Sequence, residues 1–471
     1  MRRDLVLLLA GLAAVSGCRE ADRPAGPGVG GRVVVDSDPQ GAVIYVDGTR
    51  RSQTTPDTLD DVPVGRRIIE AWRDSAGVPY GFAMRVEVPR EGMVEVWGPL
   101  LARCFDADCF AEVRQQYTVN SMRFTTTPTG RFFYVDGFGG GLYWPSTTAN
   151  SYLSTGGPIF AGVWSATSAK VAMGVYAYPD GGVIYDYLAG RPVPEIEQTA
   201  ERFSLKQTNW LLPPGTLVMA STVRGLEIKQ EVIGRADVDG VLLVRLTFRN
   251  ITNDPLYGRM DPMPEGGVTY TDAYIGYVLD PDIGDDGGAD DDLVSYDPSL
   301  GLVFAYDSNF RESGFTAGWA DRPGLIGLRL LEAPPGTNPI LTAWPNPADW
   351  YSGVIGVVDE ADGWWWLAGR QHEISSSFPD HPDGRIGFAP TSANDYRIAV
   401  SAGPLTLAPG DSARLTVAVV IAEPQAGTFT PGQAMSPGDP LDTSRAIYRV
   451  AEVLRQRALA AADLVGASAL R

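Results

Sequence analysis

Aspartates crowd one short stretch near the middle of the chain, at Asp280, Asp282, Asp285, Asp286, Asp290, Asp291 and Asp292. Two carboxylates about 5 Å apart repel each other by nearly 1 kcal/mol even in water. Such a run therefore requires a bound cation or wide solvation. Carboxylate oxygens on a flexible, glycine-containing loop suit calcium, which accepts roughly six to eight oxygen ligands without strict geometry. The chemistry that these residues indicate is cation binding.

The spacing departs from the EF-hand order, because Gly284 lies one position early and no glutamate closes the loop. We therefore predict an irregular calcium site, with a solvated acidic turn as the alternative. The predicted ligands are Asp280, Asp282, Asp285, Asp286 and Asp290. Asp297 and Asp307 could join them from the strand that follows the loop.

Tryptophan is also concentrated in one segment of the sequence. Five of the eleven tryptophans lie within one short segment, at Trp344, Trp350, Trp364, Trp365 and Trp366. If residues 364–366 formed a strand, alternation would place Trp365 on one face and its two neighbours on the other. Exposed rings stack on sugars or on partner side chains, so Trp344, Trp350, Trp364 and Trp366 are candidate binding residues. Ordinary core packing is the alternative.

The two histidines, His372 and His381, lie in one segment with several acids. Their spacing matches neither H-E-x-x-H nor a zinc-finger pattern, and no G-x-S-x-G nucleophile motif occurs. We expect a polar surface loop there. Glycosidase chemistry needs only two well-placed carboxylates, so a hydrolase stays open as an alternative.

Strands must position these groups. The runs at residues 274–279 and 302–306 flank the acidic loop and are rich in β-branched and aromatic residues. Similar short runs, separated by Gly-rich or Asp-Gly turns, recur across residues 100–425. We expect one large antiparallel β-sandwich there, or two pairs of packed sheets, because the segment exceeds what one core usually serves. The continuous apolar start of residues 241–250 predicts a strand buried on both faces.

The N-terminus carries an export signal. Two arginines precede an apolar run at residues 5–15, which is too short to span a bilayer, and small residues lead to Cys18. Val15-Ser16-Gly17-Cys18 resembles a bacterial lipobox. The resemblance implies removal of residues 1–17, acylation of Cys18 with palmitate-like chains and a membrane anchor, in place of a plain cleaved signal. Arg19 favours the outer membrane or cell surface, and residues 18–30 form a flexible tether.

The amino-acid composition indicates which classes of partner and which cellular compartment suit this protein. The formal net charge is −19, with only three lysines in the chain, so we expect no nucleic-acid binding. The remaining cysteines, Cys104 and Cys109, are close in sequence and are predicted to form a disulfide in an oxidising compartment. Free thiols or half of a metal site are the alternatives.

Residues 31–99 form the first folded unit. Five short runs rich in valine, isoleucine and aromatics predict a small antiparallel β-domain. The unit resembles the PEGA domain of bacterial envelope proteins. The matching positions are Ser37, Pro39-Gln40-Gly41-Ala42, the run 43–46 into Asp47-Gly48, Thr54-Thr55-Pro56 and Pro63-Val64-Gly65, with Gln40 in place of the signature glutamate. The resemblance implies a placement or adhesion module near the cell wall and no catalytic residue.

The large β region has a resemblance of its own. Residues 142–164, 225–252, 272–307 and 404–424 are similar, in order, to segments of a set of large secreted or surface β-proteins of bacteria. The resemblance implies architecture only. After a Pro/Gly-rich linker, residues 426–471 end in an amphipathic helix with apolar positions at Ile447, Val450, Leu454, Ala458, Ala461 and Val465. Asp442, Thr443 or Ser444 is expected to cap it, and packing on the sandwich is favoured over a coiled coil.

Together these patterns predict a mainly β protein: a small PEGA-like domain, then a large antiparallel sandwich-type domain with one C-terminal helix. The expected function is that of a non-enzymatic envelope lipoprotein which binds polysaccharide or protein, with calcium as a structural ion. The alternative is a surface carbohydrate-active hydrolase that uses paired carboxylates near residues 344–366. A hydrolase would show a deep cleft with two carboxylates beside exposed rings.

Overall fold

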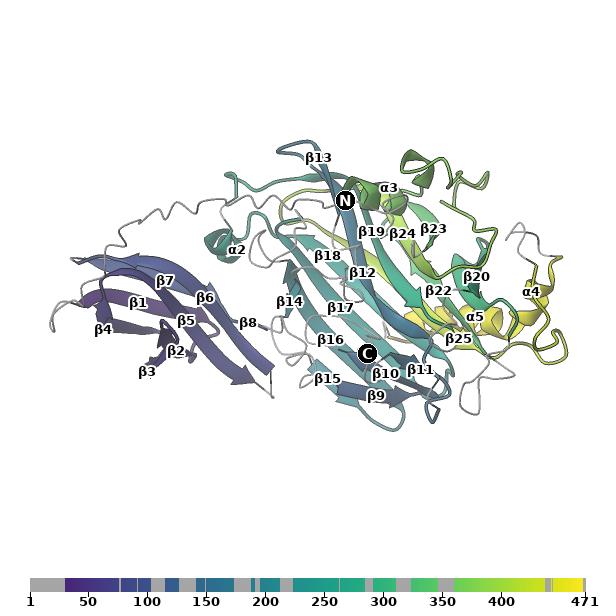
Figure 1. The fold of residues 1–471 in the computed structure, drawn as a ribbon, viewed down its shortest axis with the longest axis horizontal. Coiled ribbons are helices and arrows are strands. Elements are labelled where there is room, and N and C mark those ends of the chain that lie inside the picture. Colours follow the sequence, from purple (N-terminus) through teal and green to yellow (C-terminus); the bar gives the residue numbers. More distant parts are fainter. Residues whose placement is uncertain are drawn as a thin grey trace, which may run out of the picture.

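The computed structural model describes residues 30–75, 78–90, 92–102, 115–126, 141–148, 150–172, 188–190, 195–211, 223–261, 263–283, 291–310, 323–345, 360–436, 442 and 444–468. These residues are mainly β, in several sheets, with a helix at the C-terminal end (Figure 1). The predicted fold class is therefore confirmed.

The first unit is a pair of small sheets around an alternating apolar core. One sheet has the strand order β4 (Asp57–Pro63), β1 (Gly30–Asp38), β7 (Met93–Pro99). The other has the order β3 (Thr49–Thr54), β2 (Val43–Val46), β5 (Gly65–Ser75), β6 (Val78–Val88), β8 (Leu101–Ala102). The core includes Val33, Val35 and Phe82.

One pairing in this unit differs from the expected antiparallel pattern. β1 and β7 run parallel, with Val33 opposite Val94. The chain passes through the second sheet between these two strands, so it returns to the side of β1 in the same direction. Strands joined by such a crossover are parallel, whereas neighbours joined by a tight hairpin are antiparallel.

The large unit contains a five-stranded sheet. Its strand order is β13 (Ala169–Ala172), β12 (Leu153–Trp164), β19 (Tyr270–Pro281), β24 (Tyr396–Leu407), β23 (Asn338–Pro345). All its pairings are antiparallel. β19, which precedes the acidic loop, lies at the centre of this sheet.

A nine-stranded sheet faces it. The main path is β14 (Leu188–Gly190), β16 (Arg202–Leu211), β17 (Leu226–Arg235), β18 (Val241–Asn250), β25 (Ser412–Ala422), β22 (Leu325–Glu332), β21 (Leu302–Asp307), β20 (Asp292–Asp297), and β15 (Glu195–Gln198) also pairs with β16. β20, which follows the acidic loop, is the edge strand of this path. The loop therefore connects the centre of one sheet to the edge of the other.

The main core lies between the two sheets. Phe160 and Tyr270 of the five-stranded sheet pack edge to face at 5.0 Å, and Phe248 of the opposite sheet stacks on Phe160 at 6.3 Å. A short sheet of β9 (Gln115–Val119), β10 (Met122–Thr126) and β11 (Leu142–Tyr143) adds Phe124 to the same core. Burial of this apolar surface is the main stabilising contribution to the sandwich.

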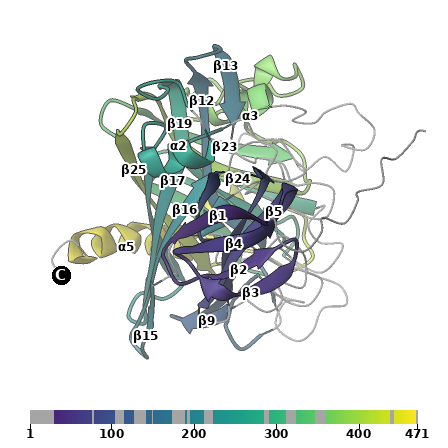
Figure 2. The same cartoon turned by 90° about the vertical axis from the view of Figure 1, so that its left-hand side faces the viewer.

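The C-terminal helix packs on the outer face of the nine-stranded sheet (Figure 2). It has two parts, α4 (Ala446–Val450) and α5 (Glu452–Ser468). Leu454 and Ala458 are buried against Val241 and Leu243 of β18, while Leu242 and Val244 of the same strand face the main core. The predicted packing of the helix and the two-sided burial of this strand are confirmed.

The helix begins differently from the predicted cap. The cap position of α4 is Arg445, and no side chain there bonds to the helix. Asp442 instead accepts hydrogen bonds from the backbone N–H and the hydroxyl of Ser444, at 3.0 and 2.7 Å. The aspartate therefore satisfies a local turn before the helix, a common alternative for this side chain.

Candidate metal centre and sheet-face groove

Three carboxylates meet where β19 ends and β24 begins. Asp280 is the penultimate residue of β19, Asp282 lies two residues later, and Asp395 immediately precedes β24. One oxygen from each lies within 4.8 Å of the others. Residues two apart on an extended chain share a face, and β19 is hydrogen-bonded to β24, so the sheet itself brings these side chains together. The group could hold a metal ion.

The side chain of Arg397 supplies a positive charge beside this cluster. Arg397 Nε lies 3.3 Å from Asp280 Oδ1, and both side chains are almost fully buried. Burial raises the pKa of Asp280, and the nearby guanidinium of Arg397 opposes that shift. The pKa of Asp282 is raised well above its usual range, first by burial and then by the charges of Asp280 and Asp395. A further cation at this cluster would favour the ionised forms of these carboxyls.

A fourth carboxylate approaches from the other sheet. Asp292, the first residue of β20, is fully buried, and its Oδ2 accepts a hydrogen bond from Ile283 N at 3.2 Å. Its backbone oxygen accepts one from Asn394 N at 2.9 Å. Asp292 is therefore held between the residues that follow Asp282 and precede Asp395. Its Oδ1 is buried without a hydrogen-bond partner, and burial, above all, raises its pKa well above the ordinary value.

The predicted ligands divide into three groups. Asp280 and Asp282 lie in the cluster, whereas Asp285, Asp286 and Asp290 fall outside the described residues. Asp307 lies directly opposite Asp292 across the pair β20–β21. Asp297 does not join them, because it forms an ion pair with Arg455 of α5 at 2.9 Å.

Asp395 was not predicted, because it lies more than a hundred residues from the acidic loop in sequence. One signal could have indicated it. Asp395 and Arg397 are two apart at the start of an apolar strand, so their opposite charges lie on one face of that strand. A buried ion pair is a common reason for charges in such a position.

The tryptophan-rich segment contributes to the core. Residues 364–366 belong to the helix α3 (Glu360–Leu367), so the expected strand alternation is wrong. Glu360 and Asp362 lie in its first turn, where acidic side chains stabilise a helix. Trp344, Trp364 and Trp366 are only 2%, 7% and 1% exposed. The alternative of core packing applies to these three rings, and Trp350 lies outside the described residues.

Trp365 differs from its neighbours because it is only partly buried. Lys170 Nζ lies 4.4 Å from the centre of its ring, and the guanidinium carbon of Arg370 lies 4.8 Å away. Two cations therefore lie close to this ring. Each cation–π contact of this kind stabilises the fold by roughly 0.5–1 kcal/mol at an exposed site.

The histidines lie on the surface, as predicted. His372 Nδ1 is 2.7 Å from Asp380 Oδ2, and each side chain is 41% exposed. His381 Nδ1 accepts a hydrogen bond from Asp383 N at 3.0 Å. Among the residues that the structure describes, Asp280, Asp282 and Asp395 are the one group of three or more potential metal ligands whose donor atoms all lie within 4.8 Å of one another.

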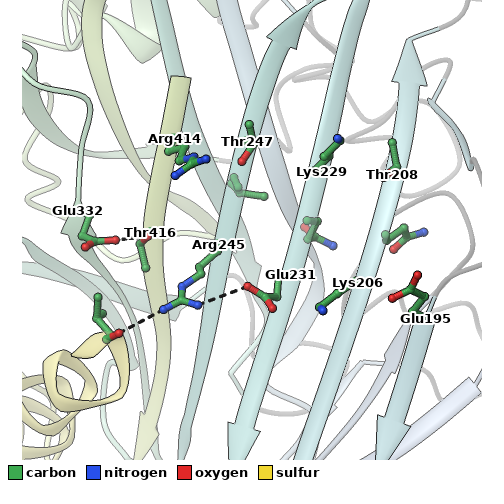
Figure 3. A pocket seen from close by; sticks show the side chains of 14 residues that line it. Glu195, Lys206, Thr208, Lys229, Glu231, Arg245, Thr247, Glu332, Arg414 and Thr416 are labelled. Atoms are coloured by element: carbon green, nitrogen blue, oxygen red, sulfur yellow. Dashed lines mark hydrogen bonds and ion pairs between the residues drawn. The ribbon is translucent and has the colours of Figure 1, made fainter. Parts of the chain in front are cut away.

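A groove of about 640 Å³ crosses the outer face of the nine-stranded sheet beside α5 (Figure 3). Side chains of neighbouring strands form two rows across it because they lie in register. One row is Glu195, Lys206, Glu231, Arg245, Thr416, Glu332. The next row is Thr208, Lys229, Thr247, Arg414. Successive groups are about 5 Å apart because that is the spacing of hydrogen-bonded strands.

Several charges in the groove are already paired. Arg245 Nη1 lies 3.4 Å from Glu231 Oε2, and Arg245 Nη2 donates to Val465 O at 3.2 Å. Thr416 donates its hydroxyl proton to Glu332 at 2.6 Å. No aromatic ring is among the described side chains that line this groove. The described lining of the groove thus presents regularly spaced hydrogen-bond donors and acceptors, without the exposed rings expected beside a glycosidase cleft.

Two further predictions concern residues outside the described ranges, namely Cys18 for lipidation and Cys104 with Cys109 for the disulfide. Lipidation and the disulfide therefore stay predictions. Within the described part of the chain, no helix has both the length and the apolar character that a membrane span requires.

Comparisons with known proteins show no family. No family model matches the chain, and no curated protein matches it. Among solved structures, lysyl oxidase from Pichia pastoris is similar at 10% identity with a TM-score of 0.26, over 71% of this chain and 54% of that one. A second structure of that enzyme gives 8% identity and a TM-score of 0.26, over 76% and 67%. The chain spans about half the length of the first structure, and likenesses this low carry no functional inference.

Proposed function

We propose that this chain is a non-enzymatic, lipid-anchored protein of the bacterial cell envelope, in which calcium stabilises the two-sheet domain. The observation that carries the proposal is the meeting of three carboxylate oxygens within 4.8 Å, from the buried Asp280 and the half-buried Asp282 and Asp395. Carboxylate-only donors suit a hard cation, and calcium tolerates irregular geometry better than magnesium does. With no histidine or cysteine in the cluster, zinc is disfavoured.

The place of the cluster explains why the ion would be structural. Asp280 and Asp282 follow the central strand of one sheet, and Ile283 next to them is hydrogen-bonded to Asp292 at the edge of the other. A cation there joins segments that are distant in sequence. Its binding free energy adds directly to the stability of the folded domain, because the unfolded chain has no preformed site.

Thermal unfolding of the purified full chain in detergent, with calcium or after removal of metal by a chelator, tests this proposal. At calcium a hundredfold above its dissociation constant, linkage adds roughly 2.7 kcal/mol to the stability. The Asp282→Asn variant should lose that increment. The matched control is Asp463→Asn, which changes an exposed aspartate of α5. Equal unfolding temperatures with and without calcium would refute the ion site.

The groove on the nine-stranded sheet is the binding face that we propose. Its rows of lysine, arginine, glutamate and threonine offer both donors and acceptors at regular spacing. The cores of protein interfaces are typically rich in aromatic residues and methionine, which the described lining lacks. The lining therefore favours a polar, hydroxyl-rich ligand such as an envelope polysaccharide over a folded protein partner.

Envelope placement rests on the sequence. The lipobox-like Val15-Ser16-Gly17-Cys18 supports a lipid anchor in the outer membrane or at the surface, and the PEGA-like residues 31–99 support a spacer near the cell wall. In this proposal the small β-unit separates the anchor from the two-sheet domain. The groove would then face polysaccharide at the membrane or wall.

A further inference from the structure

The groove on the outer face of the nine-stranded sheet is locally basic, although the protein as a whole is acidic. The whole chain has 38 lysines and arginines against 57 acidic residues. Two of its three lysines lie in this groove. The charged residues of the described lining are Lys206, Lys229, Arg245, Arg414, Glu195, Glu231 and Glu332. Basic residues therefore outnumber acidic ones here, and this local reversal of charge favours a ligand that carries negative groups.

The basic residues of the first row already have acidic neighbours. Lys206 lies opposite Glu195 on one side and opposite Glu231 on the other. Glu231 also pairs with Arg245 at 3.4 Å. Directly opposed residues of opposite charge stabilise a sheet. The charges of this row thus largely compensate one another.

The second row differs because its described members include no acid (Figure 3). Lys229 lies opposite Thr208 and Thr247, and Arg414 lies opposite Thr247. Both basic side chains are exposed. Lys229 Nζ has a carboxylate nearby, Glu227 Oε1 at 3.6 Å, but the lysine side chain is still 57% exposed. An exposed pair at this distance contributes little, so Lys229 can exchange it for a ligand.

Hydroxyl groups and cations alternate along this second row, in the order Thr208, Lys229, Thr247, Arg414. Neighbouring strands are about 5 Å apart, so the backbone positions of Lys229 and Arg414, with β18 between them, are separated by about 10 Å. That distance is comparable to the length of a disaccharide unit in an extended polysaccharide. A chain that crosses the strands can therefore present an acidic group to each cation and its hydroxyls to the threonines between them.

We infer that the groove binds an acidic polysaccharide, whose anionic groups pair with Lys229 and Arg414 and whose hydroxyls bond to Thr208 and Thr247. This inference rests on the proposed polysaccharide-binding face and names the class of its ligand. Ammonium and guanidinium groups donate charge-assisted hydrogen bonds to anionic oxygens, which are stronger than those between neutral groups. The formal net charge of −19 repels a polyanion elsewhere on the protein, so a preference for the acidic ligand depends on these two cations.

Affinity electrophoresis of the purified full chain in detergent, at one fixed calcium concentration, tests the inference. Polysaccharide extracted from the producing cells is first separated by anion exchange into a neutral and an acidic fraction, and each fraction is cast into a gel. We expect the acidic fraction to retard the unsubstituted chain more strongly than the neutral one. Raising the ionic strength from about 0.01 to 0.1 M shortens the Debye length from about 30 to 10 Å and should weaken that retardation.

The double variant Lys229→Gln/Arg414→Gln should bind the acidic fraction roughly tenfold more weakly, because two exposed ion pairs are lost. Its binding of the neutral fraction should not change. The matched control is Arg50→Gln/Arg66→Gln, which removes the same charge from exposed positions of the small β-unit. This control corrects for the altered mobility of the variant. Near-ultraviolet circular dichroism checks that both variants are folded.

The outcomes separate this inference from the proposed function. Retardation by neither fraction would refute the polysaccharide-binding face and with it this inference. Retardation by the neutral fraction that equals or exceeds that by the acidic one would overturn only the acidic class of the ligand. An equal loss of acidic binding in Arg50→Gln/Arg66→Gln would show a general effect of net charge and overturn the assignment to Lys229 and Arg414.

Discussion

Arg397 of β24 lies 3.3 Å from Asp280 of β19, from Nε to Oδ1, and both side chains are almost completely removed from solvent. On its other side, Arg397 lies opposite Trp344 of β23. Asp280 in turn lies opposite Thr155 of β12. One row across the five-stranded sheet thus joins the acidic loop to the tryptophan cluster, in which Trp344 packs on Trp366 at 5.9 Å.

Replacement of Arg397 by methionine should destabilise the metal-free domain by about 3–5 kcal/mol, because loss of one partner leaves a buried charge uncompensated. Calcium should reduce that loss, because the ion supplies the missing positive charge. Denaturant unfolding with and without calcium measures both effects. The control is Arg66→Met, which removes a surface pair whose side chains are 87% and 69% exposed and should cost less than about 1 kcal/mol. Equal losses of stability in the two variants would show that Arg397 does not compensate a buried charge on Asp280.

The metal-free protein should become less stable as the pH rises above the ordinary pKa of aspartate, about 4. The pKa values of Asp282 and Asp292 are raised well above normal, chiefly by burial, so the folded state binds more protons than the unfolded state in this window. The free energy of unfolding then falls with increasing pH, starting above the ordinary aspartate pKa of about 4. Calorimetry of metal-free and calcium-loaded samples checks the sign. The difference between their unfolding temperatures should widen with pH, and a constant difference would contradict the prediction.

Trp366→Ala should cost about 3–5 kcal/mol, as expected for a fully buried ring whose removal leaves a cavity. Trp365→Ala provides a comparison in the same helix. Its ring is only partly buried and packs on Trp364 as well as on Lys170 and Arg370, so the loss should be smaller, below about 2 kcal/mol. Urea unfolding of both variants gives the order. A larger loss for Trp365 would mean that the core of this region is arranged differently.

Thr208→Val with Thr247→Val should weaken binding of polysaccharide extracted from the producing cells. The double change removes two hydroxyls of one row in the groove and keeps the shape of the side chains. Each lost hydrogen bond contributes about 0.5–1.5 kcal/mol, so the affinity should fall roughly tenfold. Affinity electrophoresis in gels that contain the polysaccharide measures the change. Thr49→Val, in the small β-unit, is the control, and unchanged migration of the double variant would place the ligand elsewhere.

Cys18→Ser should release the protein from the membrane fraction and abolish incorporation of labelled palmitate. The reason is that acyl chains contribute roughly 0.8 kcal/mol per buried methylene, so their loss removes the anchor. Fractionation of cells that produce either form gives the result. A Cys18→Ser protein that still carries label would refute the lipobox assignment.

Properties that depend on local pattern could be predicted from the residues alone. Alternating apolar runs predicted the mainly β class, and the helical spacing of residues 447–465 predicted a packed C-terminal helix, because periodicity follows directly from backbone geometry. The continuous apolar start at residue 241 likewise indicated burial on both faces. Aspartate density marked the end of β19 as the place for a cation, and Asp280 and Asp282 do lie in the observed cluster.

Which distant groups meet depends on strand pairing, and local pattern does not encode that pairing. Asp395 joins Asp280 because β24 pairs with β19, a contact between segments more than a hundred residues apart that no local spacing encodes. The sequence offers Asp297 as a further ligand from the strand after the loop, yet that strand turns the side chain to Arg455 of the helix. The three consecutive tryptophans formed a helix in place of a strand, since tertiary packing of Trp364 and Trp366 against the sheet outweighed the β preference of aromatic residues. Strand pairing and burial depend on the whole chain. They therefore determine which side chains form the site, whereas the local density of aspartates indicates only the segment in which part of it lies.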